Sequence, residues 1–256
     1  MSKNNSTKIL VQCALFLAFG LVLRNFSYMV YMGGGTGMRL GISGFFTKMP
    51  AILFGPVYGA VVSGLTDILG FLLKPEGGYI FPLSITAACG GAVTGFLFRA
   101  FKKHSVTAIR NIYISIIVLV GLFGIFNHVT VAFFPDSLWG VFLGTLNKKI
   151  VYFTYGAYII CGLGILFYLI NLFLQHRYKN LFVNEYLKMF ITLLIADVFV
   201  TTVNTFILIA FIPTLAKLPF MTFYLPRLAQ ELVSVFINSY VLSYMYELYS
   251  KISNRG

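Results

Sequence analysis

The chain has 256 residues, of which 59% are apolar and 10% are charged, and its mean hydropathy is +0.87. Soluble domains carry about 25% charged residues, so the composition excludes an ordinary soluble protein and predicts an integral membrane protein. At about 20 apolar residues per spanning helix, the length allows roughly six to eight spans. It leaves no room for a separate ATPase or nucleic-acid module.

The net charge of +12 would suggest a nucleic-acid partner in a soluble protein. In a membrane protein, Lys and Arg beside the spans are the ordinary topogenic signal, so we expect no nucleic-acid partner. Cys13, Cys89 and Cys161 stand alone in apolar runs, which predicts neither a disulfide framework nor a metal site. The polar start of the chain leads into an apolar run without a small-residue cleavage site, so we expect a retained first helix.

Eight apolar segments are predicted to span the membrane. They cover residues 8–26, 40–54, 57–73, 82–101, 112–134, 150–174, 189–212 and 226–249. Gly55 and Pro56 separate the second from the third, because Pro is tolerated at a helix start but not in its interior. An even number of spans places both termini on one side. Because 11 of the 19 Lys and Arg residues then lie on that side, including those from Arg99 to Arg110, we expect cytoplasmic termini.

A glycine cluster from Gly33 to Gly37 connects the first two segments. It lacks the spacing of a nucleotide-binding glycine motif. Glycine permits unusual backbone angles, which favours a loop that opens and closes over a site; the alternative is a plain connector.

Charged side chains inside predicted spans are expensive and mark candidate functional sites. Lys48, Asp67 and Asp197 fit this description, and Arg39 and Arg227 stand at the outer ends of their segments. The cations on the outer side suit a site that captures an anion. The structural alternative is an interhelical ion pair, for example between Lys48 and Asp67.

Several polar and aromatic residues admit two interpretations. Thr86, Asn204 and Thr205 face a central cavity in one interpretation and bond only to a neighbouring helix in the other. Tyr79, near an outer end, belongs either to an interfacial aromatic belt or to a stacking site for a flat ligand.

The block from Arg39 to Phe98 resembles the folate-type substrate-binding (S) component of energy-coupling-factor (ECF) vitamin transporters. The resemblance rests on Arg39, the ILFGP break at Ile52 to Pro56, Asp67 followed by Leu69 and Gly70, and the GYIFP turn at Gly78 to Pro82. It resumes with VNT at Val203 to Thr205 and LPRL at Leu225 to Leu228. Ala14 and Ala18 match the AxxxA pattern by which the first helix of S components docks on the shared coupling subunit.

The resemblance implies an all-α integral membrane protein, with an S-component-like six-helix bundle and an inserted helix pair that brings the total to eight spans. Residues 1–107 would form the first four core helices, 108–185 the inserted pair and 186–256 the last two core helices. Lys48 departs from the family pattern, which is apolar at that position. The inserted helix pair also departs from the family pattern, so the resemblance does not decide the identity of the substrate.

The resemblance further implies a vitamin receptor of the cell membrane that works with a transmembrane coupling subunit and two ABC ATPases, and not an enzyme. The implied substrate-binding residues are Arg39, Asp67, Tyr79, Thr86, Asn204 and Arg227. Asp67 and Asn204 suit the amide-like edges of a pterin ring, and Arg39 and Arg227 suit the anionic glutamate tail, because guanidinium binds carboxylate through two parallel hydrogen bonds. No cofactor or metal is expected on this chain.

Two alternatives stay open. One keeps the architecture and changes the ligand to another vitamin or to a modified-base precursor. The other is a membrane-embedded transferase with Asp67, Asp197 and His128 as candidate residues. No His and carboxylate cluster has the spacing of a metal site, and no GxSxG motif occurs, which disfavours the enzyme.

Overall fold

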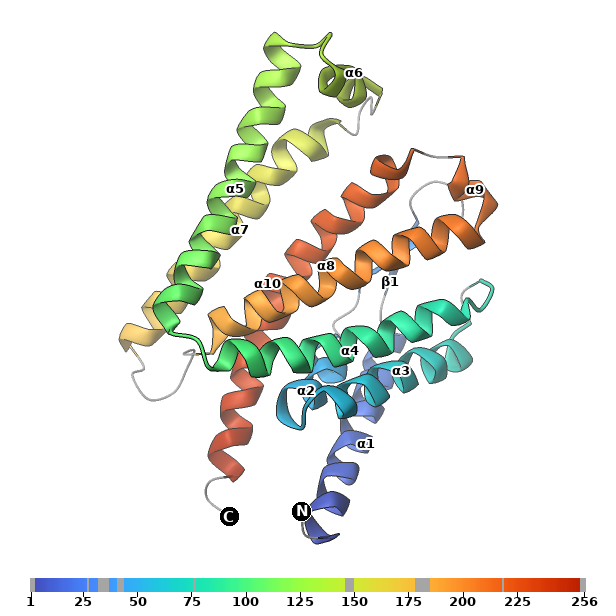
Figure 1. The fold of residues 1–256 in the computed structure, drawn as a ribbon, viewed down its shortest axis with the longest axis vertical. Coiled ribbons are helices and arrows are strands. Elements are labelled where there is room, and N and C mark those ends of the chain that lie inside the picture. The colour runs from blue at the N-terminus through green and yellow to red at the C-terminus, as the bar shows by residue number, and fades with distance from the viewer. Residues whose placement is uncertain are drawn as a thin grey trace.

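The structure is a computed structural model that describes residues 3–26, 28–31, 37–40, 44–75, 77–145, 150–177, 185–217 and 219–253. It describes the backbone only for the two strands and for residues 3–5, 25, 145, 150–154 and 253. Its elements are α1 (Lys3–Asn25), β1 (Tyr28–Tyr31), β2 (Gly37–Leu40), α2 (Gly44–Leu53), α3 (Pro56–Leu73), α4 (Phe81–Lys102), α5 (Val106–Phe133), α6 (Leu138–Thr145), α7 (Ile150–Arg177), α8 (Tyr186–Phe211), α9 (Pro213–Ala216) and α10 (Phe220–Ser253). Helices α1 to α4, α8 and α10 form a bundle, and α5 and α7 form a hairpin beside it (Figure 1).

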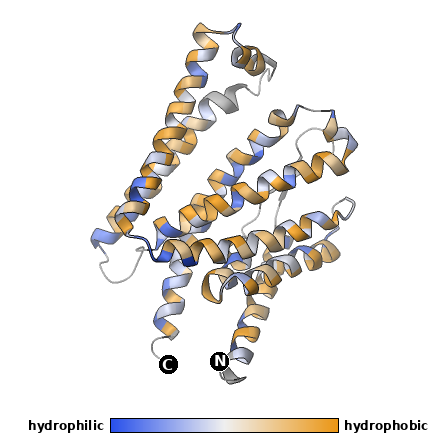
Figure 2. Cartoon of the chain, in the orientation of Figure 1, coloured by the Kyte–Doolittle hydropathy of each residue, from blue (hydrophilic) through white to orange (hydrophobic). Residues whose placement is uncertain are grey.

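Six of the described helices are long and apolar enough to cross a membrane: α1, α3, α4, α5, α7 and α8. Apolar residues cover most of their length (Figure 2). The chain is therefore a multi-pass membrane protein. The start of α1 and the end of α10 lie at the same end of the molecule (Figure 1), as termini on one side of a membrane require. Which side that is stays a prediction.

The second predicted span is wrong. The helix in that region, α2, has 10 residues, which at about 1.5 Å per residue is half of the roughly 30 Å hydrocarbon core. Its apolar residues are buried instead, among them Met49 and Ala51. The segment was apolar because it packs inside the bundle and not because it meets lipid. The 34-residue α10 is long enough to span but is not among the six, so its membrane crossing stays a prediction.

An all-α protein was expected, and the structure adds one short antiparallel sheet. β1 pairs with β2, with Met29 opposite Arg39. The glycine cluster falls between the two strands, and residues 33–36 lie outside the described part of the chain, so its predicted gating is not tested.

The ILFGP sequence breaks the chain between α2 and α3, as predicted. Gly55 has a φ of 107°, a left-handed region that favours glycine, and Pro56 starts α3. Arg99 of α4 crosses this break and donates from Nη2 to the Phe54 carbonyl oxygen at 3.0 Å. A Cβ on Gly55 would lie 1.9 Å from the same Nη2. Glycine is therefore needed here for its backbone angle and for the close approach of Arg99.

Small residues let α3 and α4 pack backbone to backbone. A Cβ on Gly91 would lie 2.2 Å from the Gly59 carbonyl oxygen, and one on Gly59 would lie 2.6 Å from the Gly91 carbonyl oxygen. Only residues without a side chain allow α3 and α4 to approach this closely.

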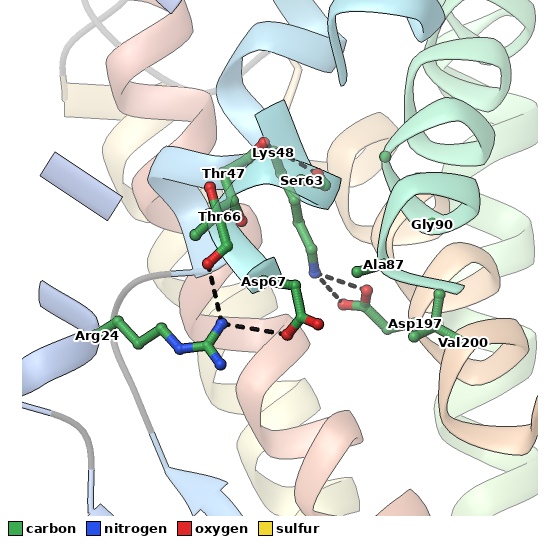
Figure 3. A pocket seen from close by; sticks show the side chains of 11 residues that line it. Arg24, Thr47, Lys48, Ser63, Thr66, Asp67, Ala87, Gly90, Asp197 and Val200 are labelled. Atoms are coloured by element: carbon green, nitrogen blue, oxygen red, sulfur yellow. Dashed lines mark hydrogen bonds and ion pairs between the residues drawn. The ribbon is translucent and has the colours of Figure 1, made fainter. Parts of the chain in front are cut away.

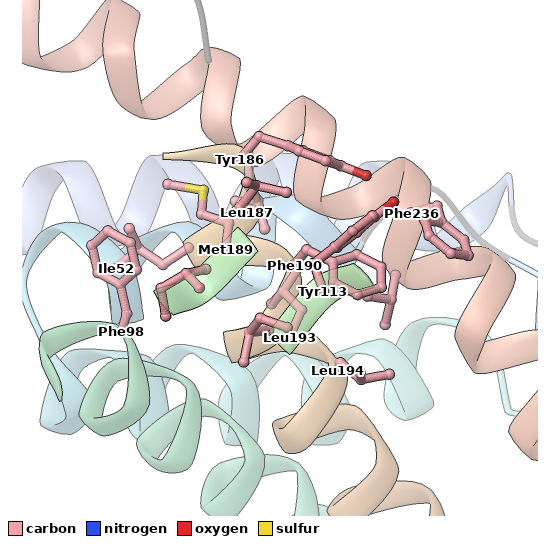
Figure 4. Packing of buried hydrophobic residues seen from close by; sticks show 14 of the residues in the cluster. Ile52, Phe98, Tyr113, Tyr186, Leu187, Met189, Phe190, Leu193, Leu194 and Phe236 are labelled. Carbon is pink, nitrogen blue, oxygen red and sulfur yellow. The ribbon is translucent and has the colours of Figure 1, made fainter. Parts of the chain in front are cut away.

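Buried aromatic residues join the α5–α7 hairpin to the bundle (Figure 4). The Tyr113 ring of α5 lies 4.7 Å from the Phe190 ring of α8, which lies 4.9 Å from the Phe236 ring of α10. The Tyr113 hydroxyl also donates to the Gly164 carbonyl oxygen of α7 at 2.8 Å. This core holds the hairpin against α8 and α10.

Candidate functional site

A cavity of about 220 Å³ lies inside the bundle and is lined by five helices. Its lining residues are Arg24 of α1, Thr47 and Lys48 of α2, Ser63, Thr66 and Asp67 of α3, Ala87, Gly90 and Gly91 of α4, and Asp197 and Val200 of α8. The side of α4 contributes only small residues, which leaves the space open. Two ion pairs line this cavity (Figure 3).

The first ion pair joins α1 to α3. The Arg24 Nη1 atom lies 3.2 Å from Asp67 Oδ1 and also donates to the Thr66 carbonyl oxygen at 3.1 Å. A Cβ on Gly70 would lie 2.4 Å from the Arg24 Cδ. Gly70, one turn after Asp67, therefore makes room for the Arg24 side chain. This accounts for the three-residue spacing between Asp67 and Gly70, which places both residues on the side of α3 that faces Arg24.

The second Asp67 oxygen is bound from α4. Ser84 Oγ donates to Asp67 Oδ2 at 2.7 Å, and the Tyr79 hydroxyl lies 2.8 Å from Ser84 Oγ. Arg24 and Ser84 together occupy two of the roughly four lone-pair sites of a carboxylate. Asp67 is thus held in one orientation and keeps acceptor capacity toward the cavity.

The second ion pair joins α2 to α8 across 149 residues of sequence. Lys48 Nζ lies 2.6 Å from Asp197 Oδ1 and 2.5 Å from Asp197 Oδ2. The exposed fraction of the side chain is 18% for Lys48 and 9% for Asp197. The alternative of an interhelical ion pair therefore holds for Lys48, but its partner is Asp197 and not the Asp67 named as the example. Lys48 reaches away from α3 to α8, and Arg24 takes the Asp67 carboxylate instead.

A further acid on α10, Glu231, interacts with the Lys48–Asp197 pair. The Glu231 carboxyl interacts electrostatically with Asp197, Lys48 and Arg227 and hydrogen-bonds to Thr201, one turn after Asp197 on α8. Arg227, one turn before Glu231, lies with its guanidinium 5.1 Å from the centre of the Phe223 ring. Glu231 was not among the predicted residues. Its i to i+4 spacing from Arg227 was the signal that could have revealed it.

The structure gathers only part of the predicted binding set. Asp67 lines the cavity. Tyr79 does not line it and is connected to Asp67 only through the Ser84 hydroxyl; the residue is 43% exposed. Thr86 donates to the Asn204 side-chain oxygen, and both stand outside the cavity lining. These two residues thus follow the interhelical alternative. Thr205 follows neither interpretation, because its hydroxyl donates to the Thr201 carbonyl oxygen one turn earlier on its own helix, α8.

Arg39 and Arg227 were predicted to bind an anion. Arg39 stands on β2 opposite Met29, and its side chain lies outside the described part of the structure. Arg227 is half-buried and does not line the cavity. Ala14 and Ala18, the predicted docking residues, are both exposed on α1.

The residues proposed for a transferase are not brought together. Asp67 and Asp197 line the cavity, whereas His128 lies on α5 against the Tyr155 ring of α7. Within the described ranges, no three His, Cys, Asp or Glu side chains group as metal ligands do.

Comparison with known proteins gives one informative match. The chain is 31% identical over 85 residues to the folate transporter FolT of Clostridium novyi (strain NT). The matched stretch covers 33% of this chain and 49% of that protein, so the chain spans about half the length of the curated relative it matches. No protein-family model and no solved structure matches the chain. The relative is named for folate transport.

Proposed function

We propose that the chain is the substrate-binding membrane subunit of an ECF-type vitamin importer that captures folate or a related pterin at the outer face. The supporting observation is the charged cavity inside a bundle of membrane helices, because charges at this depth are costly and mark a binding or transport site. The partial similarity to a folate transporter supports the ligand class. A coupling subunit and two ABC ATPases on other chains would drive release inside.

The size of the cavity favours binding of the ring and not of the whole vitamin. Its volume of about 220 Å³ is below the roughly 300–1,000 Å³ of pockets that bury a drug-sized ligand. In our proposal a flat bicyclic ring enters the cavity, with its N–H groups donating to Asp67. The glutamate tail would then lie outside, where Arg39 is the proposed partner for its carboxylates.

A different ligand with the same ring chemistry, such as another vitamin or a modified-base precursor, is the second candidate. The observation behind it is the α5–α7 hairpin, which the family pattern lacks. Mass spectrometry of the small molecule that copurifies with the detergent-solubilised chain separates the two candidates. A folate or pterin supports the first, and a different nitrogen heterocycle supports the second.

The binding residue to test first is Asp67. Asp67→Asn removes a charge-assisted acceptor worth about 1.5–3 kcal/mol, so folate affinity should fall roughly 10- to 100-fold in equilibrium dialysis. Asp136→Asn, which changes an exposed loop carboxylate, is the matched control and should leave the affinity unchanged. Equal affinities of the wild type and Asp67→Asn would contradict the proposed role, and no folate binding by the wild type would contradict the proposed ligand.

A further inference from the structure

Lys48 keeps a hydrogen-bond donor that its ion-pair partner does not use. A lysine ammonium has three N–H groups, and the two oxygens of Asp197 accept from Lys48 Nζ at 2.6 and 2.5 Å. The salt bridge thus accounts for two N–H groups and holds the ammonium in one place. Because Lys48 lines the cavity, the third N–H group can bond to a ligand there.

Asp67 offers the opposite chemistry in the same cavity. Its two oxygens accept from Arg24 and Ser84, which leaves about two of the roughly four lone-pair sites of a carboxylate. An ionised carboxylate only accepts hydrogen bonds, and an ammonium only donates them. The Asp67 carboxylate and the Lys48 amine reach the cavity from α3 and α2 (Figure 3). The cavity therefore presents both an acceptor and a donor to one ligand.

The cavity carries no net charge. Of the lining residues that the structure describes, only four are charged, and they form the pairs Arg24 with Asp67 and Lys48 with Asp197. An uncompensated charge inside a membrane protein is strongly disfavoured, so the site favours a neutral ring. This agrees with the proposed function, in which the anionic tail lies outside. The α4 side of the wall adds only alanine and glycine, against which a flat ring can lie.

We propose that Lys48 is a specificity-determining residue that selects rings in which a carbonyl oxygen stands beside an N–H group. Asp67 accepts from the N–H side of such a ring, and Lys48 donates to its carbonyl oxygen. Asp197 keeps the lysine ammonium in position for this bond. The inference rests on the proposed function for the class of ligand, because the ring of folate has such an edge.

The same geometry rejects a ring that has an amino group in place of the carbonyl oxygen. That amino group turns a donor toward the Lys48 ammonium, so neither group finds an acceptor. A site built around a hydrogen bond discriminates strongly against an analogue that cannot make it, because the buried polar group of the site is then left unpaired. Aminopterin is this analogue of folate and carries the same glutamate tail.

Equilibrium dialysis of the detergent-solubilised full chain with folate and with aminopterin measures the preference. The wild type should bind folate roughly 10- to 100-fold more tightly, the range for one hydrogen bond to a charged group. Pterin and diaminopteridine, the two rings without a tail, should show a preference in the same direction, because the tail lies outside the cavity. A preference that is absent from the tail-free rings would contradict recognition by Lys48.

The double variant Lys48→Met/Asp197→Leu removes the donor without leaving a buried charge unpaired. Its preference for folate should disappear or reverse, because Asp67 alone accepts from the amino groups of either ring. Lys48→Arg keeps a donor-only cation and should keep the preference. Lys217→Met, at an exposed lysine, is the matched control and should bind both ligands as the wild type does. A merely structural role of Lys48 would change both affinities and leave their ratio unchanged.

The outcomes separate this inference from the proposed function. Folate binding by the wild type with equal or tighter binding of aminopterin overturns the role of Lys48 and leaves the proposed function standing. The wild-type preference retained in the double variant does the same. Absence of binding of both ligands by the wild type overturns the proposed ligand and the inference together. The wild-type ratio tests the inference even where the double variant fails to fold.

Discussion

At the scale of single residues, the ion pairs set the chemistry of the cavity. Sequence alone marked Lys48, Asp67 and Asp197 as costly charges within apolar segments, and all three line the cavity. It did not reveal their partners. A pair such as Lys48 and Asp197 forms across 149 residues, and only the packing of α2 against α8 decides which acid a lysine stem can reach.

The Lys48–Asp197 pair should be strongly coupled in stability. Lys48→Met leaves Asp197 without its cation in a nearly buried position, which should cost about 3 kcal/mol of unfolding free energy. Thermal unfolding in detergent measures the loss, and Lys217→Met, at an exposed lysine, should change little. Adding Asp197→Leu should restore most of the stability. If the losses of unfolding free energy of Lys48→Met and Asp197→Leu simply add in the double variant, the two side chains do not stabilise each other.

At the scale of elements, the bundle depends on one close seam between α3 and α4. Gly91 has two roles at this seam. It packs against Gly59 of α3, and it also lines the cavity. The spacing of the small residues was visible in the sequence. Which helices they would join was not, since any small-residue stripe can pack within the fold or against a partner.

Gly91→Ala should test this seam. Its Cβ would lie 2.2 Å from the backbone oxygen of Gly59, so α3 and α4 must separate, at a cost of about 1–3 kcal/mol. Gly162→Ala in α7 is the matched control, because no atom lies within 4 Å of its Cβ position. The control should be neutral or slightly stabilising through helix propensity. Equal unfolding temperatures for the two variants would contradict the seam.

At the scale of the whole molecule, a six-helix bundle carries an additional hairpin on one side (Figure 1). The hairpin is fastened through Tyr113 to α8 and α10, on the side away from α1. In our proposal α1 therefore keeps an open face for a coupling subunit. Ala14 and Ala18 lie exposed on that helix, where small side chains would allow a partner helix to approach closely.

Ala14→Leu and Ala18→Leu should abolish uptake by cells that express the full transporter, because added bulk keeps the partner helix at a distance. Folate binding by the isolated variants should stay at the wild-type level. Ala132→Leu, at an exposed alanine of α5, should leave both properties intact. Normal uptake by Ala14→Leu and Ala18→Leu would rule out docking at this face.

The sequence by itself determined the membrane setting, most helix boundaries and the break at Gly55 and Pro56, because these follow from local composition and backbone chemistry. It also indicated a binding function through the charges inside apolar segments. Only the tertiary structure decided that α2 is a buried half-length helix, that Arg24 binds Asp67, and that Lys48 binds Asp197. Those features depend on contacts between helices that are far apart in the chain. Hydropathy does not reveal such contacts, because an apolar residue has the same hydropathy whether it faces lipid or another helix.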